Sequence, residues 1–367
     1  MTQPMHVLFR EGYRLFFPWS ALVGLGLTVL WGGSFAGGWA MPMPPQTHGM
    51  AMLLGVWGAA ILGFLLTAYP RQNEAAPPGR ALIAGLLALH GLSILAILPT
   101  GALLPVALRV VAAAAPWLVA AGWSAMIARA SLARRYDGTT AAVPIAFLGA
   151  AIAAGCFVAG ATDLGVRLAI HGFAVVAGLS VLDRVLPFFS SRLVPNYSGY
   201  RAAWFAPLLG VAVVVRVCVP ALPWLGDIAL IALILRQLWG WQPWPAAREP
   251  MLGVIHLGVA WLIVGYVLDA AGAKPASLAA HAWLLGGLGT LWAGVTMRVT
   301  RGHSGQPIHM GVDGAVIVAA VQLAAATRLF AGATAAGPGV YAVASLFLAV
   351  AWLGWLVRLG PLVARHA

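Results

Sequence analysis

The chain has 367 residues, of which 62% are hydrophobic and only 8% are charged, and its formal net charge is +12. An average soluble domain carries roughly 25% charged residues, so this composition excludes a soluble protein and indicates an integral membrane protein. The positive charge does not indicate a nucleic-acid partner, because the arginines are scattered between apolar runs and form no basic patch.

Twelve apolar runs fill most of the chain, and each approaches the roughly 20 residues that a membrane-spanning helix needs. We therefore expect an all-α integral membrane protein with about twelve transmembrane helices in a single polytopic domain, residues 1–367. In chain order the runs are 16–37, 48–69, 81–99, 103–127, 143–161, 165–188, 202–220, 224–241, 251–271, 277–297, 311–330 and 338–359.

Lysine and arginine are unequally distributed between alternate loops. Of the 21 basic residues, sixteen fall on the side that holds both termini. Because positively charged loops remain in the cytoplasm, both termini are predicted to be cytoplasmic. The five basic residues on the other side are Arg109, Arg167, Arg216, Lys274 and Arg328.

Histidine is the side chain best suited to chemistry in this apolar interior, since polar residues at membrane depth are costly. His48, His171 and His281 each open a run that starts near the outer end of a span and ends with arginine at the cytoplasmic end. These runs are spans two, six and ten, which predicts three four-helix units in a pseudo-threefold arrangement. The units would be 1–142, 143–250 and 251–367.

Imidazole binds iron and copper, and two histidines on facing helices are enough to hold a haem. His48, His171 and His281, at similar depth, are therefore predicted to be metal or haem ligands. His90 and His256 also lie in spans, where ligation and packing are equally consistent with the sequence. For His6 and His366 at the termini and for His309 in a loop, we expect a hydrogen-bonded or solvent-exposed side chain and no ligand role.

Methionine gives a weaker indication of copper. Met41, Met43, Met50 and Met52 lie around His48, and thioethers favour Cu(I). Membrane cores also use methionine as filler, so packing is the alternative explanation.

Acidic residues are scarce, and Asp183 is the one carboxylate that we place well inside a span. It is a candidate proton carrier or, with the adjacent Arg184, part of a contact to a haem propionate. A satisfied polar pair is the alternative. With no acidic pair beside the histidines, a carboxylate-bridged di-iron site or an acid–base hydrolase is not expected.

Five segments resemble the NnrS family of bacterial inner-membrane proteins, and together they cover most of the chain. Arg298 and His303 lie in the most specific segment, where the family has a near-identical motif. The segments are FREGYRLFFPWSAL, HGMAMLLGVWGAAILGFLLTAYP, HGFAVVAGLSVLDRVLPFFSSRLVP, EPMLGVIHLGVAWL and HAWLLGGLGTLWAGVTMRVTRGHSGQP. Family positions are also occupied by His48, His171, His256, His281, Gly302, Gly305 and Pro307.

The resemblance implies a haem- and copper-containing protein linked to nitric oxide metabolism and tolerance. Two departures stand out. The family's second helix opens His-x-His-Glu-Met, whereas this chain has Gln46, His48 and Gly49, so a histidine and a glutamate are missing. Gln306 replaces the arginine of the family's Gly-Arg-Pro ending. The chain is therefore expected to be a divergent branch with altered metal content.

A looser topological similarity links the three units to the catalytic subunit of haem–copper oxidases and nitric oxide reductases. By that similarity, His48 and His281 would bind haem b, and His171 would lie at a copper or substrate site. The seventh span, 202–220, contains no histidine. A three-histidine copper centre of the usual kind is therefore not expected.

The sequence leads to an expected oxidoreductase that binds and reduces nitric oxide at a haem or metal site, with quinol as electron donor. Protons would come through Asp183, histidines or water. A transporter or handler of copper, haem or nitrosyl-iron species is the alternative, and an assembly factor with bound haem is a third. His256 and His303 would serve a second cofactor or be structural. We expect Arg184, Arg298 and Arg301 either to contact haem propionates or lipid phosphates or to act only as cytoplasmic anchors.

Overall fold

A computed structural model describes residues 7–135, 137–219 and 221–365. The model is 80% helical, and the described residues contain no β-strand. This confirms the predicted all-α membrane protein. His6 and His366 lie outside the described residues.

Ten helices in the described part of the chain are long and apolar enough to cross a membrane, and each coincides with a predicted run. Seven are continuous spans. They are α2 (Tyr13–Phe35), α5 (Arg80–Ile97), α6 (Val106–Leu132), α7 (Gly138–Val158), α13 (Pro250–Ala270), α16 (Val312–Ala333) and α17 (Pro338–Arg358), which continues into a 3₁₀ turn, η5 (Gly360–Ala364).

The other three spans change from α-helix to π-helix and back. The second span consists of α3 (Pro45–Met50), η1 (Ala51–Trp57) and α4 (Gly58–Gln72). The sixth consists of α8 (Thr162–Arg167), η3 (Leu168–Val175) and α9 (Val176–Ser191). The tenth predicted run consists of α14 (Ser277–His281), η4 (Ala282–Leu288) and α15 (Gly289–His303).

The remaining two predicted runs are helical but differ from the other ten. Helix α10 (Phe205–Cys218) has 14 residues, about 21 Å of helix, whereas the hydrocarbon core is about 30 Å thick. Helix α11 (Pro223–Gly240) is longer, but Asp227, Arg236 and Gln237 lower its mean hydropathy. Two short elements complete the fold, the 3₁₀ turn η2 (Pro99–Leu103) and α12 (Pro243–Ala247).

Helix starts follow from local sequence. Proline occupies the first helical position of α11, α13 and α17, where no backbone N–H is needed. Asp137 caps α7 by accepting a hydrogen bond from the backbone N–H of Thr139 at 2.9 Å. These residues fix the starts of helices whose lengths are set by apolar composition.

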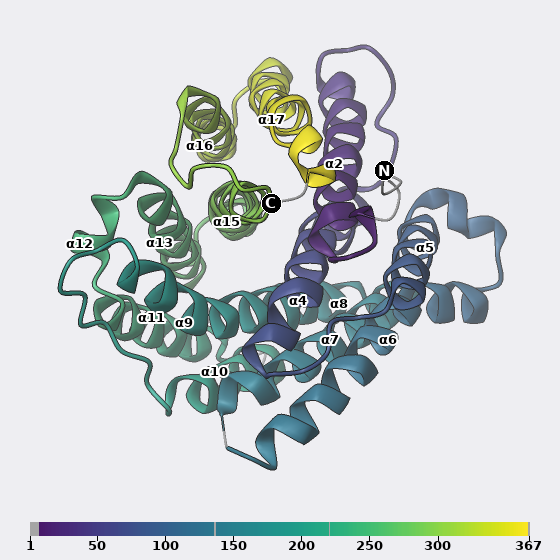
Figure 1. Ribbon diagram of the computed structural model, residues 1–367. Coiled ribbons are helices and arrows are strands. Elements are labelled where there is room, and N and C mark those ends of the chain that lie inside the picture. The colour runs from purple at the N-terminus through teal and green to yellow at the C-terminus, as the bar shows by residue number, and fades with distance from the viewer. Residues whose placement is uncertain (1–6, 136, 220, 366–367) are drawn as a thin grey trace. The chain divides into compact units, whose positions relative to one another are not determined.

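The chain divides into two compact units. Unit 1 comprises residues 7–23, 43–182 and 363–365, and unit 2 comprises 24–42 and 183–362. In unit 1, α6 packs along α5 and α7. In unit 2, α13 contacts α11, α15 and η4, and α16 packs against α17 (Figure 1).

The three spans with π-helical segments are also the most buried. In their most apolar stretches 83%, 67% and 78% of the residues are buried, compared with at most 56% in the other spans. A span that faces lipid keeps an exposed apolar side, so a largely buried span lies among other helices. The three predicted ligand histidines therefore belong to interior spans.

Candidate cofactor site

Each π-helical segment lies beside one of the three histidines predicted to be ligands. The segment η1 begins three residues after His48, η3 contains His171, and η4 begins directly after His281. Such segments are rare and are frequently found at functional sites. The same departure from α-helical geometry thus recurs in all three spans that carry the predicted ligands, and the three-unit organisation stays a prediction.

Side chains from two other helices hold the π-segment η1. Where an α-helix changes to a π-helix, the hydrogen-bond register shifts and carbonyl groups become available. His90 Nε2 on α5 lies 3.1 Å from the carbonyl oxygen of Leu54. The hydroxyl of Ser20 on α2 donates to the carbonyl of Val56 at 2.8 Å. Helices α2 and α5 thereby fix the backbone that follows His48.

His90 is itself fully engaged. Its Nδ1 atom accepts a hydrogen bond from the indole N–H of Trp19 at 3.1 Å, and Nε2 donates to Leu54. A neutral imidazole has one donor and one acceptor, and both are in use in this buried ring. Of the alternatives that the sequence left open for His90, the structure favours packing.

Within unit 1, His48 and His171 lie on neighbouring segments. Helix α3 contacts α8, and η1 contacts η3. The His171 side chain is 1% exposed, whereas His48 is half-buried. Unit 1 thus brings two of the three predicted ligand segments together.

In unit 2, His281 and His256 are each oriented by a carbonyl one turn earlier. Nδ1 of His281 lies 2.6 Å from the Ser277 carbonyl oxygen, and Nδ1 of His256 lies 2.8 Å from that of Leu252. A histidine that donates from Nδ1 leaves its Nε2 lone pair for a ligand, and metal-bound histidines commonly make such a bond. No described N–H or O–H group donates to Nε2 of His256. At His256, Nε2 is therefore the ring atom that would bind a haem or metal.

Among residues 7–135, 137–219 and 221–365, no group of three or more His, Cys, Asp or Glu side chains is placed to hold a metal ion. His48 and His171 belong to unit 1, and His281 belongs to unit 2. The shared site of these three histidines therefore stays a prediction.

Asp183 is buried and has partners in unit 2. The side-chain amide of Gln237 donates to its Oδ1 at 2.7 Å, and Nε of Arg201 lies 3.3 Å from Oδ2. The Asp183 side chain is 1% exposed, whereas that of Arg201 is 38% exposed. The ion-pair partner thus comes from the loop after α9, while the adjacent Arg184 is half-buried.

That loop is fastened to the end of α11. The hydroxyl of Tyr197 donates to the carbonyl of Trp241 at 3.0 Å, and the amide of Gln242 donates to the hydroxyl of Ser198 at 2.7 Å. Burial raises the pKa of the Tyr197 phenol, so it remains a protonated donor at neutral pH. These contacts anchor the segment that carries Arg201.

The two arginines of α15 have different surroundings. Arg298 is 5% exposed, its Cζ lies 4.1 Å from the ring centroid of Phe189, and its Nε and Nη1 atoms have no hydrogen-bond partner in the described structure. Arg301 donates to Asp313 at 2.7 Å. His303 is half-buried and ends the helix. Nε of Arg301 also has no partner in the described structure, but Arg298 has two such N–H-bearing atoms and no ion-pair partner among the described residues.

Arg298 is remote from His281 along the same span. Seventeen residues separate them, which is about 25 Å of helix. Gly294, one turn before Arg298, approaches Ile255 beside His256. Any role of Arg298 toward a propionate or another anion therefore belongs near His256 and apart from His281.

One cluster was missed by the sequence reasoning. Arg216 on α10 binds two aspartates, Asp227 on α11 and Asp269 on α13. Asp183 is thus not the only carboxylate buried within a helix, since the Asp227 side chain is also 1% exposed. The available signal was Arg216 itself, an isolated charge within the apolar run VAVVVRVCV.

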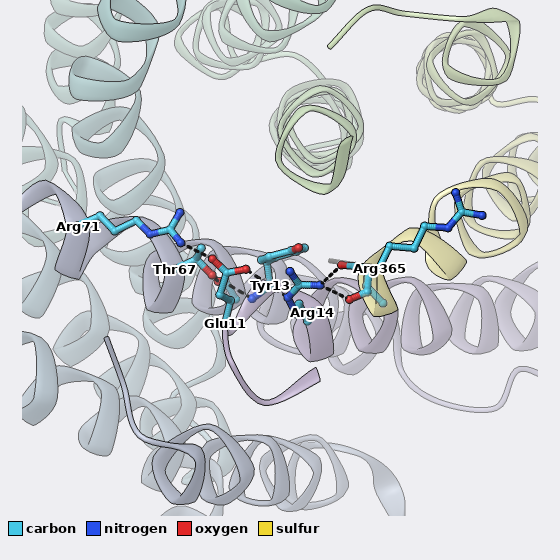
Figure 2. Close-up of polar contacts among 8 residues, drawn as sticks. Glu11, Tyr13, Arg14, Thr67, Arg71 and Arg365 are labelled. Carbon is cyan, nitrogen blue, oxygen red and sulfur yellow. Dashed lines mark hydrogen bonds and ion pairs between the residues drawn. The ribbon is translucent and has the colours of Figure 1, made fainter. Parts of the chain in front are cut away.

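The FREGYR segment forms a second cluster, in unit 1, with the opposite balance of charge (Figure 2). Glu11 binds both Arg71 and Arg14, the latter at 3.2 Å. Nη1 of Arg14 also donates to the carbonyls of Val363 and Arg365, at 2.5 and 2.8 Å. The cluster therefore joins the start of α2, the end of α4 and the C-terminal segment.

Gly12 permits the close packing in this cluster. A Cβ atom at Gly12 would lie 2.4 Å from Cβ of Leu66, which no real contact allows. Next to it, the backbone N–H of Tyr13 donates to the Thr67 hydroxyl at 3.1 Å. Close packing and hydrogen bonding against α4 thus explain why the N-terminal family segment has these residues.

Two comparisons with known proteins bear on the chain. A family model described as NnrS protein matches residues 7–366, nearly the whole chain. No curated protein matches it.

Proposed function

The chain belongs to the NnrS family, and we propose that it is a haem-binding inner-membrane protein that binds and reduces nitric oxide at a haem or metal site. The NnrS family fits the assignment of this chain as a membrane protein of the nitric oxide response. Haem, copper, quinol and catalytic turnover are parts of the proposal.

The observation that carries this proposal is the repeated placement of a histidine beside a π-helical segment in the most buried spans. Buried imidazoles are costly in a membrane unless they are bound. The Nδ1 contact of His281 to the Ser277 carbonyl orients the ring, and Nε2 would be the atom that binds iron. His48 and His281 would hold haem b, and His171 would lie at a copper or substrate site.

A ferrous haem with an open position supplies the metal orbital that binds nitric oxide. The chain would orient that group through its histidines and exclude water through the buried spans. Asp183, paired with the partly exposed Arg201, is the proposed proton carrier on the side where we place the cytoplasm. Arg298 lies about 25 Å from His281 along the span, at about 1.5 Å per residue. A haem or metal held by His256 and Arg298 would therefore be a second cofactor.

Three of the four methionines near His48 are buried, namely Met43, Met50 and Met52. Buried thioethers suit packing as well as Cu(I). Met41, which is 45% exposed, is the methionine available to capture copper from solvent.

The proposed orientation places both termini in the cytoplasm. Sixteen of the 21 basic residues support it. Labelling of single cysteines introduced at Arg80 and at Lys274, in spheroplasts with a reagent that does not cross membranes, would test it. We expect labelling only at position 274.

The decisive experiment is an optical and metal analysis of the purified protein. We expect a Soret band that shifts under nitric oxide, and nitric oxide consumption in proteoliposomes supplied with quinol. Absence of haem from correctly folded protein would overturn the proposal. Haem without consumption would leave an assembly factor, and protein-dependent movement of copper or iron across the vesicle would favour the transporter.

Variants identify the ligands. His48→Ala and His281→Ala are expected to lose the Soret band, whereas the exposed His309→Ala is the matched control and should retain it. Retention of the band in both His48→Ala and His281→Ala would reject the ligand assignment while leaving haem binding intact.

A further inference from the structure

The cluster of Arg216, Asp227 and Asp269 has one positive charge for two carboxyl groups. Nε of Arg216 lies 2.5 Å from Oδ1 of Asp227, and Nη2 of Arg216 binds Oδ2 of Asp269. Within the part of the chain that the structure describes, no second arginine or lysine forms a salt bridge with either aspartate. With both carboxyl groups ionised, the cluster would carry a net charge of about −1.

Burial makes that charge unfavourable. The side chains of Arg216 and Asp227 are 8% and 1% exposed. Oδ2 of Asp227 is buried and accepts no hydrogen bond from the described residues, and the two aspartates also interact with each other. Two carboxylates held by one guanidinium in a poorly solvated site repel each other, so the doubly ionised cluster is unfavourable.

The helices are built to bring these groups together. A Cβ atom at Gly226 would lie 2.6 Å from Cα of Arg216, so α11 starts in backbone contact with α10. This approach places Asp227, the next residue, against the guanidinium. Helix α11 also packs along α13, which supplies Asp269. The close pairing of the carboxyl groups is therefore a consequence of helix packing.

Three helices contribute the charged groups of the site, and α13 also contacts α14, which carries His281, and α15, which carries Arg298. Helix α10 contributes Arg216, α11 contributes Asp227, and α13 contributes Asp269. Helix α13 also contributes the buried Tyr266, whose phenol interacts electrostatically with all three charged side chains. Segment η4, which also packs against α13, presents the uncharged Trp283 to Tyr266 at 5.2 Å between ring centroids.

From these observations we propose that Arg216, Asp227 and Asp269 form a proton-binding site in which the two carboxyl groups share one proton. Asp269 is 26% exposed and connects the site to solvent. Protonation takes a proton from water and changes the cluster from a net charge of about −1 to zero.

The site lies close in the fold to the segment of His281. Tyr266 stands one turn before Asp269 on α13, and its ring packs on Trp283, two residues after His281. The claim that a reaction at His281 uses this proton rests on the function proposed above. The claim that the cluster binds a proton does not. The cluster thus offers a proton source at that end of unit 2, separate from Asp183.

Infrared spectroscopy of the purified full-length protein tests the proposal. A protonated carboxyl group gives a C=O band that shifts in D₂O. We expect such a band in the wild type, with its loss at alkaline pH. The band should also be absent from Asp227→Asn and Asp269→Asn, because each leaves one carboxylate neutralised by Arg216. The exposed Asp163→Asn is the control that should keep it.

If Asp227→Asn does not fold, Asp269→Asn gives the same measurement at a more exposed position. The proposal is overturned if the wild type has no such band between about pH 5 and pH 9, or if the band survives in both variants. The band without nitric oxide consumption would reject the proposed function alone. Consumption without the band would reject the proton site alone.

Discussion

The two arginine clusters have opposite compositions. In the Glu11 cluster one carboxylate is shared by Arg14 and Arg71, and backbone carbonyls take up further N–H groups of Arg14. In the Arg216 cluster one guanidinium is shared by two carboxylates. In the first cluster backbone carbonyls thus supply acceptors for Arg14, whereas in the second cluster Oδ2 of Asp227 accepts no hydrogen bond from the described residues. The first cluster therefore joins segments of the chain, and the second is the proposed proton-binding site.

The largest effect is expected from Arg216→Leu. It would leave the buried Asp227 and the partly exposed Asp269 without a cation, and breaking a buried ion pair costs about 3–5 kcal/mol. We expect a marked fall in the free energy of unfolding in detergent. Adding Asp227→Asn to Arg216→Leu should recover part of the loss, and a double variant as unstable as the single one would contradict the shared-charge explanation.

Arg14→Leu should break the other cluster at its centre. Arg14 is 3% exposed and donates to two carbonyls as well as to Glu11. Loss of hydrogen bonds to a charged group costs about 1.5–3 kcal/mol. The thermal midpoint should fall, and deletion of residues 363–367 should cause a similar fall in the wild type but little further change in the variant.

Gly12→Ala tests the contribution of close packing to the Glu11 cluster separately from that of charge. The added Cβ would lie 2.4 Å from Leu66, and overpacking of this kind costs about 1–3 kcal/mol. Gly26→Ala, within α2, is the control, since its Cβ would meet nothing within 4 Å. Equal thermal midpoints for the two variants would show that the approach at Gly12 is not tight.

The smallest effect is expected from Arg71→Leu. Its side chain is 61% exposed, and Glu11 keeps Arg14 as a partner. Exposed ion pairs contribute about 0.2–1 kcal/mol. The change in unfolding free energy should therefore be near the limit of measurement, and a loss as large as that of Arg14→Leu would mean that both arginines act as one unit.

The sequence was sufficient for the helices and their order, because long apolar runs have few other stable forms in a membrane. It did not predict that the run 202–220 contains only a 14-residue helix, α10. Nor did it predict η1, η3 and η4, since a π-helix differs from an α-helix in hydrogen-bond register and can have the same apolar composition.

Partners across helices were the least predictable part of the site. The packing role of His90 depends on Trp19 and Leu54, which come from other spans. Asp183 pairs with Arg201, eighteen residues away in a loop. Charge counts by loop placed Arg216 among the outer residues but gave no information on which acids it binds.

The contacts of Arg14 have a consequence for biosynthesis. The carbonyl groups that it binds belong to residues 349 and 351 positions later. A chain is made from its N-terminus, so Arg14 leaves the ribosome long before its acceptors exist and must remain hydrated or bound elsewhere until residues 363 and 365 have been made. A product arrested before residue 363 would therefore carry an open N-terminal segment for quality-control proteases to recognise.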